Sequence, residues 1–244
     1  VSSASGAISS MAHHTNKLMV GACCSQQAEY NRAGELQILD LHTSKTKVLQ
    51  GHGVEQERRT VSVVQSTSSG FVSAGYDGSV CQWDIEGNLT WRKSVSGKPV
   101  LSMVVLNRGG LVVCGTALGQ LISIDTNTYE TVILRTLCNS NVIGANWIDI
   151  LETCEAGVLV GTAFSTASKS GCLESWDLTS QSNKSVCTLP HQRGLSAVCT
   201  TTDNVILVGT GSVIHNRPEI SGDGLIRLFD ARTDPQSTST INTN

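Results

Sequence analysis

Residues 71–85 read FVSAGYDGSVCQWDI and predict a β-hairpin. The first half of this segment is apolar, Asp77-Gly78 is a turn pair, and the second half alternates apolar and polar side chains up to Trp83-Asp84. An Asp-Gly pair between two strand-like segments is a strong short-range hairpin signal. Because a single hairpin is only marginally stable in water, this one requires neighbouring strands.

The hairpin belongs to a series of similar segments. A strand-like segment ends in Asp five times, at intervals of 44, 41, 52 and 53 residues, at Asp40, Asp84, Asp125, Asp177 and Asp230. Self-similarity at such a period is the signature of a repeat architecture, in which each unit packs on the next. The repeats occupy approximately residues 1–52, 53–97, 98–138, 139–191 and 192–244.

The second repeat resembles the WD40 repeat, which is a four-stranded propeller blade with Gly-His ahead of it and Trp-Asp near its end. In that family a His, a Ser or Thr, the turn Asp and the Trp form a buried hydrogen-bonded tetrad. The matching residues here are His52 (after Gly51), Ser73, Asp77 and Trp83. The resemblance implies an all-β propeller of four-stranded antiparallel blades, about five of them, over nearly the whole chain. It fixes no activity, because a widely shared fold hosts many functions.

The third repeat departs from this pattern. Aligned on the same turn, it has Cys114, Leu118 and Ile124 in place of the Ser, the Asp and the Trp. Removing all the polar partners together leaves no buried polar group unsatisfied, and such a replacement can be nearly neutral. We therefore expect apolar packing at these three positions.

The number of repeats indicates whether the blades can form a closed ring. Propellers of this family usually have seven blades, whereas five repeats consume this chain. We expect a single, partial propeller whose missing blades come from polypeptide outside the chain, either on the N-terminal side of Val1 or from a partner. Alternatively, the five blades close on themselves, with Val1 to Ser5 lending an outer strand to the last blade. The polar tail after Arg232 would give a short edge strand or a frayed end.

Composition excludes several classes of protein. The 244 residues are 39% hydrophobic and 15% charged, which suits one sizeable packed domain. The net charge of −3 gives no reason to expect a basic surface for nucleic acid. No apolar run has the length of a membrane-spanning helix, so we expect no membrane insertion. The nine cysteines include no C-x-x-C and mostly fall in strand-like segments, which favours buried thiols in an intracellular compartment, cytoplasmic or nuclear.

Three repeats lengthen the loop between their second and third strands, at residues 25–33, 163–171 and 211–221. In the propeller family these loops open on the top face, so they would cluster there. A binding site on that face and three tolerated elongations both fit this pattern. The candidate contact residues are Glu29, Tyr30, Arg32, Phe164, Lys169, His215 and Arg217, with Arg58 and Arg59 in the loop that precedes the second repeat. The Glu57-Arg58-Arg59-Thr60 context lacks the Phe-Arg-Arg-Gly setting of phosphoinositide-binding propellers, so we reject that role.

Motifs for catalysis are missing from the sequence. It contains no G-x-x-x-x-G-K-S/T, no G-x-S-x-G and no H-E-x-x-H. His13 and His14 are adjacent, and adjacent side chains of a strand point to opposite faces, so they cannot easily share a metal. We expect no enzymatic activity, no catalytic residue, no cofactor and no metal.

One motif suggests a specific partner. Phe229-Asp230-Ala231-Arg232 resembles the W-D-x-R element with which propeller substrate receptors dock on the adaptor of cullin-RING ubiquitin ligases. The other four repeat ends lack the Arg. Asp230 and Arg232 are therefore candidate docking residues.

The sequence favours a non-catalytic WD40-type scaffold or adaptor that binds other proteins or peptides within a multi-subunit complex. Three alternatives stay open. They are a ligase substrate receptor that uses Arg232, a structural subunit of a coat or pore assembly with an open propeller, and a propeller hydrolase with a metal in its central channel.

Overall fold

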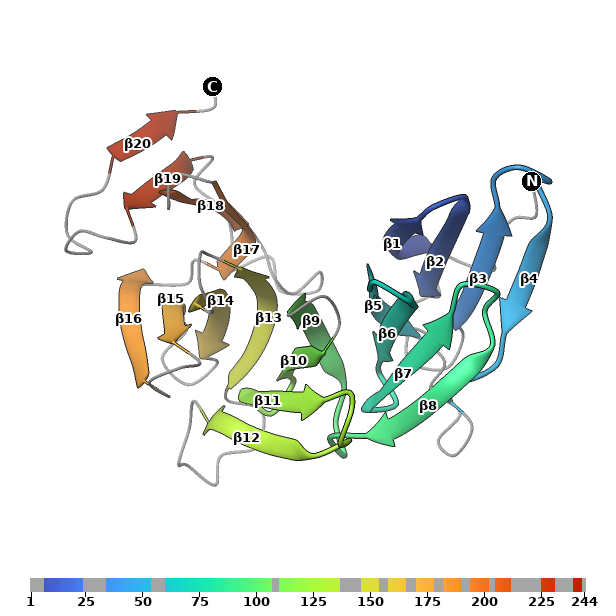
Figure 1. The fold of residues 1–244 in the computed structure, drawn as a ribbon. Helices are drawn as coiled ribbons and strands as arrows, with labels where there is room; N and C mark the ends of the chain where they lie inside the picture. The colour runs from blue at the N-terminus through green and yellow to red at the C-terminus, as the bar shows by residue number, and fades with distance from the viewer. Residues whose placement is uncertain are drawn as a thin grey trace. The chain divides into compact units, whose positions relative to one another are not determined.

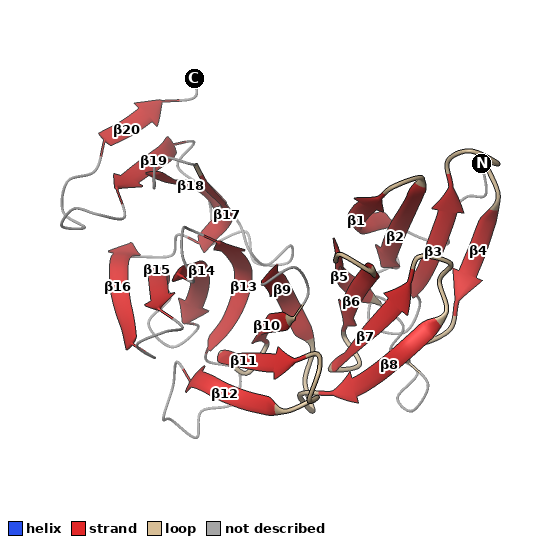
Figure 2. Cartoon of the chain, in the orientation of Figure 1, coloured by secondary structure: helices blue, strands red, loops and turns tan. Residues whose placement is uncertain are grey.

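The computed structural model describes residues 7–23, 34–53, 60–106, 110–136, 146–153, 158–165, 170–177, 182–189, 194–201, 205–211, 225–230 and 239–242. Within these ranges the chain forms twenty strands joined by turns and loops (Figure 2). The described part of the chain contains no helix that is long and apolar enough to span a membrane.

The strands form five four-stranded sheets in chain order (Figure 1). In each sheet, strands that are consecutive in the sequence lie side by side. The first sheet contains β1 (Ala7–His14), β2 (Lys17–Cys23), β3 (Gly34–Asp40) and β4 (Thr46–Leu49). The second contains β5 (Val61–Ser66), β6 (Gly70–Gly75), β7 (Ser79–Asp84) and β8 (Leu89–Ser94). The third contains β9 (Val100–Leu106), β10 (Leu111–Thr116), β11 (Gln120–Asp125) and β12 (Thr131–Thr136).

The last two sheets follow the same plan. The fourth contains β13 (Asn146–Thr153), β14 (Val158–Ser165), β15 (Ser170–Asp177) and β16 (Ser182–Leu189). The fifth contains β17 (Gly194–Thr200), β18 (Val205–Gly211), β19 (Leu225–Asp230) and β20 (Ser239–Asn242). The chain divides into two compact units, one of residues 1–116 and 122–133 and the other of residues 117–121 and 134–244. The first unit contains the first two sheets and most of the third.

The polar tail forms an edge strand, which is one of the two outcomes expected from the sequence. β20 pairs with β19 from Leu225↔Asn242 to Leu228↔Ser239, and β18 pairs with the other side of β19. The outer strand of the fifth sheet is thus β20, and the alternative in which Val1 to Ser5 supply that strand is wrong for this sheet. Residues 1–5 themselves lie outside the described ranges.

Each of the five repeated Asp residues is the last residue of the third strand of its sheet. In the first three sheets the reason is visible, because one carboxylate oxygen of the Asp accepts two backbone N–H groups of the following turn. Asp40 Oδ1 accepts from His42 and Thr43 at 2.9 and 2.8 Å. Asp125 Oδ1 does the same for the two residues at positions 127 and 128. The Asp therefore organises the turn that leads to the fourth strand.

The first strand of each described sheet carries a β-bulge at the same place. The pairing of this strand with the second shifts by one residue, which leaves one extra residue on the first strand, namely Ser9, Ser62, Leu101, Asp149 and Ser196. A bulge of this kind bends the strand and increases its twist. Its recurrence shows that the repeat extends to the level of single residues.

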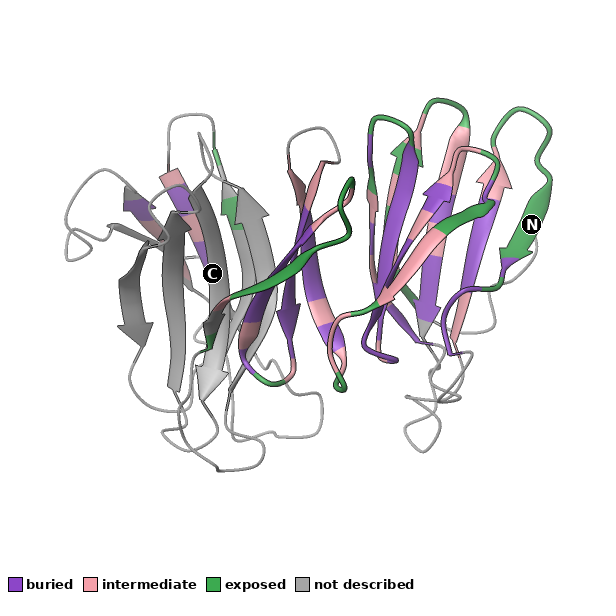
Figure 3. Cartoon of the chain, turned by 60° about the horizontal axis from the view of Figure 1, so that its bottom comes forward, coloured by how far each residue is buried: buried purple, intermediate pink, exposed green. Residues whose placement is uncertain are grey.

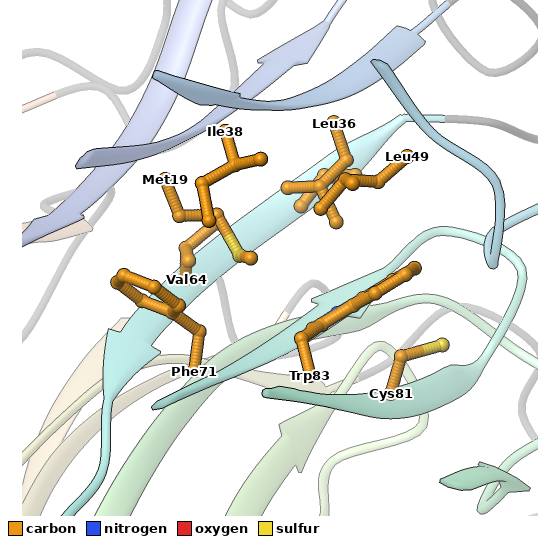
Figure 4. Packing of buried hydrophobic residues seen from close by; sticks show 9 residues of the cluster. Met19, Leu36, Ile38, Leu49, Val64, Phe71, Cys81 and Trp83 are labelled. Carbon is orange, nitrogen blue, oxygen red and sulfur yellow. The ribbon is translucent and has the colours of Figure 1, made fainter. Parts of the chain in front are cut away.

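Buried residues, purple in Figure 3, occur in all three sheets of the first unit. Between the first and second sheets, residues from both form one buried cluster of Met19, Leu36, Ile38, Leu49, Val61, Val64, Phe71, Cys81 and Trp83 (Figure 4). A second cluster joins the second and third sheets and consists of Val72, Ala74, Val80, Val100, Met103, Val112, Cys114 and Ile124. Burial of a large apolar side chain contributes on the order of 1.5–3 kcal/mol, so these two layers hold the three sheets together.

Candidate functional site

The four residues predicted to form a tetrad come from four neighbouring segments of the second sheet. His52 lies in the segment that leads to β5, Ser73 in β6, Asp77 in the turn between β6 and β7, and Trp83 in β7. All four residues are buried. The structure therefore brings together side chains that are up to 31 positions apart in the sequence.

These residues are joined by hydrogen bonds. The Trp83 indole Nε1–H donates to Ser73 Oγ at 2.8 Å, and Ser73 Oγ lies 2.8 Å from His52 Nε2. On the other side of the ring, His52 Nδ1 lies 3.1 Å from Asp77 Oδ1. The chain of contacts thus runs Trp83, Ser73, His52, Asp77, as the sequence resemblance implies.

Asp77 also collects partners that the sequence comparison does not name. Its Oδ2 accepts from the Gly53 backbone N–H at 2.9 Å and from the Ser79 hydroxyl at 2.6 Å. The Arg92 guanidinium, from β8, lies 3.4 Å from the same oxygen. Ser79 stands two residues after the turn Asp in the sequence, and this spacing is the available sequence signal. In the structure Ser79 is fully buried, and a buried polar group needs a partner. The Arg92 contact could not be predicted, because it depends on the pairing of β7 with β8.

The surroundings shift the pKa of both His52 and Asp77. Burial opposes protonation of His52, but the contacts with Cys81 and with the Asp77 carboxylate outweigh it and raise the pKa of His52 to about 9. Burial alone would raise the pKa of Asp77, yet the hydrogen bonds from His52 and Ser79 hold this pKa well below its ordinary value. At a pH below the pKa of His52, His52 and Asp77 form a buried ion pair, in which the protonated imidazole donates Nδ1–H to Asp77 and Nε2–H to Ser73 Oγ.

Two glycines create the space for this network. A Cβ on Gly51 would lie 2.5 Å from Trp83 Cη2, so only Gly lets the indole pack against the chain ahead of His52. Gly78 follows Asp77 with φ of +74°, a left-handed conformation that side chains disfavour, and a Cβ there would lie 1.9 Å from the Ser96 carbonyl oxygen. The Gly-His and Asp-Gly pairs of the sequence thus have direct steric causes.

Ser73, His52 and Asp77 follow the order of hydroxyl, imidazole and carboxylate in a nucleophilic triad. The surroundings argue against that use, since Ser73 is 0% exposed and its hydroxyl oxygen already accepts from Trp83. A protonated His52 also cannot accept a proton as a general base. The hydrogen bonds of the tetrad connect the segment before β5 with β6, with β7 and with the turn between these two strands.

In the third sheet two of the three substituted positions behave as expected. Cys114 and Ile124 are buried in the cluster shared with the second sheet, and burial raises the pKa of the Cys114 thiol to about 12. Leu118 differs, because its side chain is 47% exposed. The expectation of apolar packing is therefore wrong for Leu118.

The cysteines also give a mixed result. Cys81 and Cys114 are buried free thiols, as the sequence indicates, whereas Cys199 on β17 is exposed. His13 and His14 diverge on β1, with His13 exposed and His14 packed edge-on against Phe71 at a ring-centre distance of 6.0 Å. Within the described ranges, no group of three or more His, Cys, Asp or Glu side chains is arranged to hold a metal ion.

Most of the other predicted contact residues lie in parts of the chain that the structure does not describe. Outside the described ranges lie Glu29, Tyr30, Arg32, Arg58, Arg59, Lys169, His215, Arg217 and Arg232. The backbone of Phe164 belongs to β14, where it pairs with Gly171. Asp230 is the last residue of β19 and pairs with Val205. Both candidate surfaces, on the long loops and at Arg232, stay predictions.

The four-stranded sheets and their buried network define the class of fold, which is a WD40-type β-propeller. A solved structure of the Dos1 propeller is similar to this chain with a TM-score of 0.73 and 18% sequence identity, over 98% of this chain and 63% of that one. A chain in the crystal structure of a mitotic checkpoint complex is similar with a TM-score of 0.66 and 13% identity, over 96% of this chain and 66% of that one. This chain thus spans about two thirds of the length of each.

No protein family model and no curated protein matches the sequence. At identities this low, the structural likeness shows the fold and no activity. The all-β, four-stranded architecture predicted from residues 71–85 and the repeated Asp is confirmed.

Proposed function

We propose that this protein is a non-catalytic interaction scaffold, which binds other proteins or peptides inside the cell as one member of a multi-subunit complex. The observation that carries the proposal is that the buried polar residues of the first unit bond to one another. The one Ser-His-Asp arrangement among the described residues is buried and ion-paired, so it stabilises a sheet. What such a fold offers to other molecules is its loops and rims.

The comparisons add support at the level of the fold. One similar chain comes from the crystal structure of a mitotic checkpoint complex, so this fold is compatible with membership of a multi-subunit complex. The predicted long loops at residues 25–33 and 211–221 are the first candidates for the contact surface, because a repeat array places loops of one class on one face. The third predicted loop, 163–171, is wrong as given, because its two ends belong to β14 and β15 and the two strands pair as far as Ser165↔Ser170.

The proposal is tested by affinity purification of the tagged, full-length protein from its own cells, with quantitative mass spectrometry. A double variant, Tyr30→Ala with Arg32→Ala, should reduce the recovery of a reproducible set of partners. The matched control is His42→Ala with Lys45→Ala, which alters two exposed residues in the turn at the other end of β3. Partners lost equally in both variants would contradict the assignment to the long loops, and the recovery of no partner at all would contradict the scaffold.

A second candidate function is that of a substrate receptor for a cullin-RING ligase. The observation in its favour is that, of the five repeat ends, only the fifth carries an Arg two residues after the Asp, at Arg232. In the same purification, Arg232→Ala should remove a cullin adaptor from the recovered proteins while the melting temperature stays nearly unchanged. The docking role requires a surface side chain, and a surface substitution usually alters stability by less than about 0.5 kcal/mol. Adaptor recovery that Arg232→Ala leaves intact, or no adaptor at all, would exclude this function.

A further inference from the structure

Turns of one form follow the third strand in the first three sheets. In each turn, the backbone N–H of the Asp that ends the strand donates to a carbonyl oxygen four or five residues later. The residue immediately before this acceptor has a left-handed backbone in all three turns. These residues are Ser44 with φ of 55°, Gly87 with φ of 72° and Tyr129 with φ of 59°. Because the conformation favours Gly and is unusual for a bulky residue, Tyr129 is under backbone strain.

Contacts within the first unit hold Tyr129 in this conformation. Its N–H donates to the Asp125 carbonyl oxygen at 2.8 Å, and its carbonyl oxygen accepts from Lys93 Nζ at 2.7 Å. Its ring lies edge-on to the Trp91 ring, with the ring centres 5.8 Å apart and the planes at 65°. Trp91 and Lys93 belong to β8, so β8 lies beside the turn between β11 and β12 (Figure 1). We call Trp91, Lys93 and Tyr129 the aromatic site.

The aromatic site retains groups that can bind a ligand. Tyr129 is 46% exposed, and its hydroxyl makes no hydrogen bond to the described residues. The Lys93 ammonium has three N–H donors and gives one of them to the Tyr129 carbonyl oxygen. Trp91 packs against the cluster between the second and third sheets, and its indole N–H donates to the Gln82 side-chain oxygen. Trp91 therefore contributes ring surface, whereas Tyr129 and Lys93 contribute donors. Backbone strain at an exposed residue is a feature of functional sites.

We infer that the aromatic site binds a proline-rich segment of a partner protein in the polyproline II conformation. This conformation has no internal hydrogen bonds and Pro has no N–H, so such a segment presents carbonyl acceptors, which match the Tyr129 hydroxyl and the Lys93 ammonium. Its pyrrolidine rings pack on the aromatic rings, as in other modes of polyproline recognition. Lys93 disfavours a cation, which is the other common ligand of aromatic rings. The inference goes beyond the proposed function, because the aromatic site shares no residue with the long loops.

The test is a titration of fluorescein-labelled decaproline with the purified full-length protein, followed by fluorescence anisotropy. A Gly-Ser peptide and an alternating Glu-Ala peptide of the same length are the control ligands for a flexible and for an acidic chain. Tyr129→Gly should weaken decaproline binding by about tenfold or more, because aromatic anchors are the residues whose truncation costs most at interfaces. It should not lower the melting temperature, since Gly favours the left-handed backbone. Ser44→Gly relieves the equivalent position of the first sheet and should leave binding unchanged.

A second variant separates the hydroxyl from the ring. Tyr129→Phe keeps the ring and its packing on Trp91, so it should fold normally and weaken decaproline binding by roughly threefold to tenfold through the lost donor. The inference is overturned if decaproline does not bind at millimolar concentration, if either control peptide binds equally well, or if Tyr129→Gly and Tyr129→Phe both bind decaproline like the wild type. None of these results depends on the partners recovered in the affinity purification, so the scaffold function and this inference can fail separately.

Discussion

At the scale of single residues, the buried network shows what a short sequence motif can specify. The sequence names His52, Ser73, Asp77 and Trp83 as one group, and the structure joins them by hydrogen bonds of 2.8–3.1 Å. Each of these side chains would be costly to bury alone, because an unpaired buried polar group costs free energy. The four are therefore interdependent, and a change at one should affect the others.

Ser73→Ala tests this dependence. The substitution leaves the Trp83 indole N–H and the His52 Nε2–H without their acceptor, so it should lower the free energy of unfolding by on the order of 1–3 kcal/mol. Ser73→Thr keeps the hydroxyl and is the control for its chemistry. Urea denaturation followed by Trp fluorescence measures both variants. Equal stability of Ser73→Ala and wild type would show that the network contributes little.

The pKa values of the ion pair predict a pH dependence. The pKa of His52 is raised from 6.5 to about 9, so its contribution is complete below pH 6.5 and is lost as pH rises through 9. The pKa of Asp77 is lowered from 3.8, so its contribution is present above pH 3.8 and is lost on acidification. The difference in unfolding free energy between wild type and His52→Gln should therefore be largest between these limits and shrink toward pH 9. Denaturation of both proteins over a pH series measures it, and a difference that is independent of pH would contradict the ion pair.

The thiols give a further test of burial. Cys199 is exposed, whereas Cys81 and Cys114 are buried, and the raised pKa of Cys114 leaves its thiol protonated at neutral pH. Brief alkylation of the native protein with iodoacetamide should modify Cys199 and spare the two buried thiols, as mass spectrometry of the peptides would show. Alkylation after denaturation is the control. Native modification of Cys114 would contradict the close packing of the second and third sheets.

At the scale of elements, the turns carry much of the sequence signal. Asp40, Asp84 and Asp125 recur because each accepts two backbone N–H groups of the turn that follows its strand. Gly78 follows the turn Asp because its conformation and its contact with Ser96 exclude a side chain. Features of this kind are local, so they can be predicted from a few neighbouring residues.

Gly78→Ala should show how tightly the turn is specified. A left-handed conformation costs a non-Gly residue about 1–2 kcal/mol, and the clash with the Ser96 carbonyl adds to this. Gly97→Ala is a matched control, since a Cβ there would meet nothing within 4 Å. Thermal unfolding should show a clearly lower melting temperature for Gly78→Ala and little change for Gly97→Ala. Similar melting temperatures for the two variants would contradict the strained turn.

Features that depend on contacts between elements could not be predicted from the sequence. The exposure of Leu118, the exposed thiol of Cys199 and the contact of Arg92 with Asp77 all depend on which neighbouring strand or layer is present. No pattern in the sequence indicates the bulges at Ser9 and Ser62, yet the hydroxyl groups of these two residues connect one sheet to the next. The strands and the Asp at the end of each repeat could be predicted, because they depend on neighbouring residues and recur along the sequence. The contacts named here join residues that are distant in the sequence.

At the scale of the whole molecule, the fold narrows the function only to a class. The chain matches propellers whose sequences share less than a fifth of its residues, so fold and activity must be argued separately. The proposal of a non-catalytic role therefore rests on the chemistry of the network. The Ser73 hydroxyl is buried and the pKa of His52 is raised, so this Ser-His-Asp series stabilises the second sheet.

That conclusion has a direct chemical test. A fluorophosphonate probe reacts with serine nucleophiles that are exposed and activated by a neutral His, and Ser73 fulfils neither condition because it is 0% exposed and hydrogen-bonded to a protonated His52. The native protein should therefore remain unlabelled over the pH range in which a known serine hydrolase, added to the same sample, is labelled completely. Ser73→Ala serves as the background control. Labelling of the native protein that disappears in Ser73→Ala would mean that the sheet opens to expose a working nucleophile, and the non-catalytic scaffold would have to be abandoned.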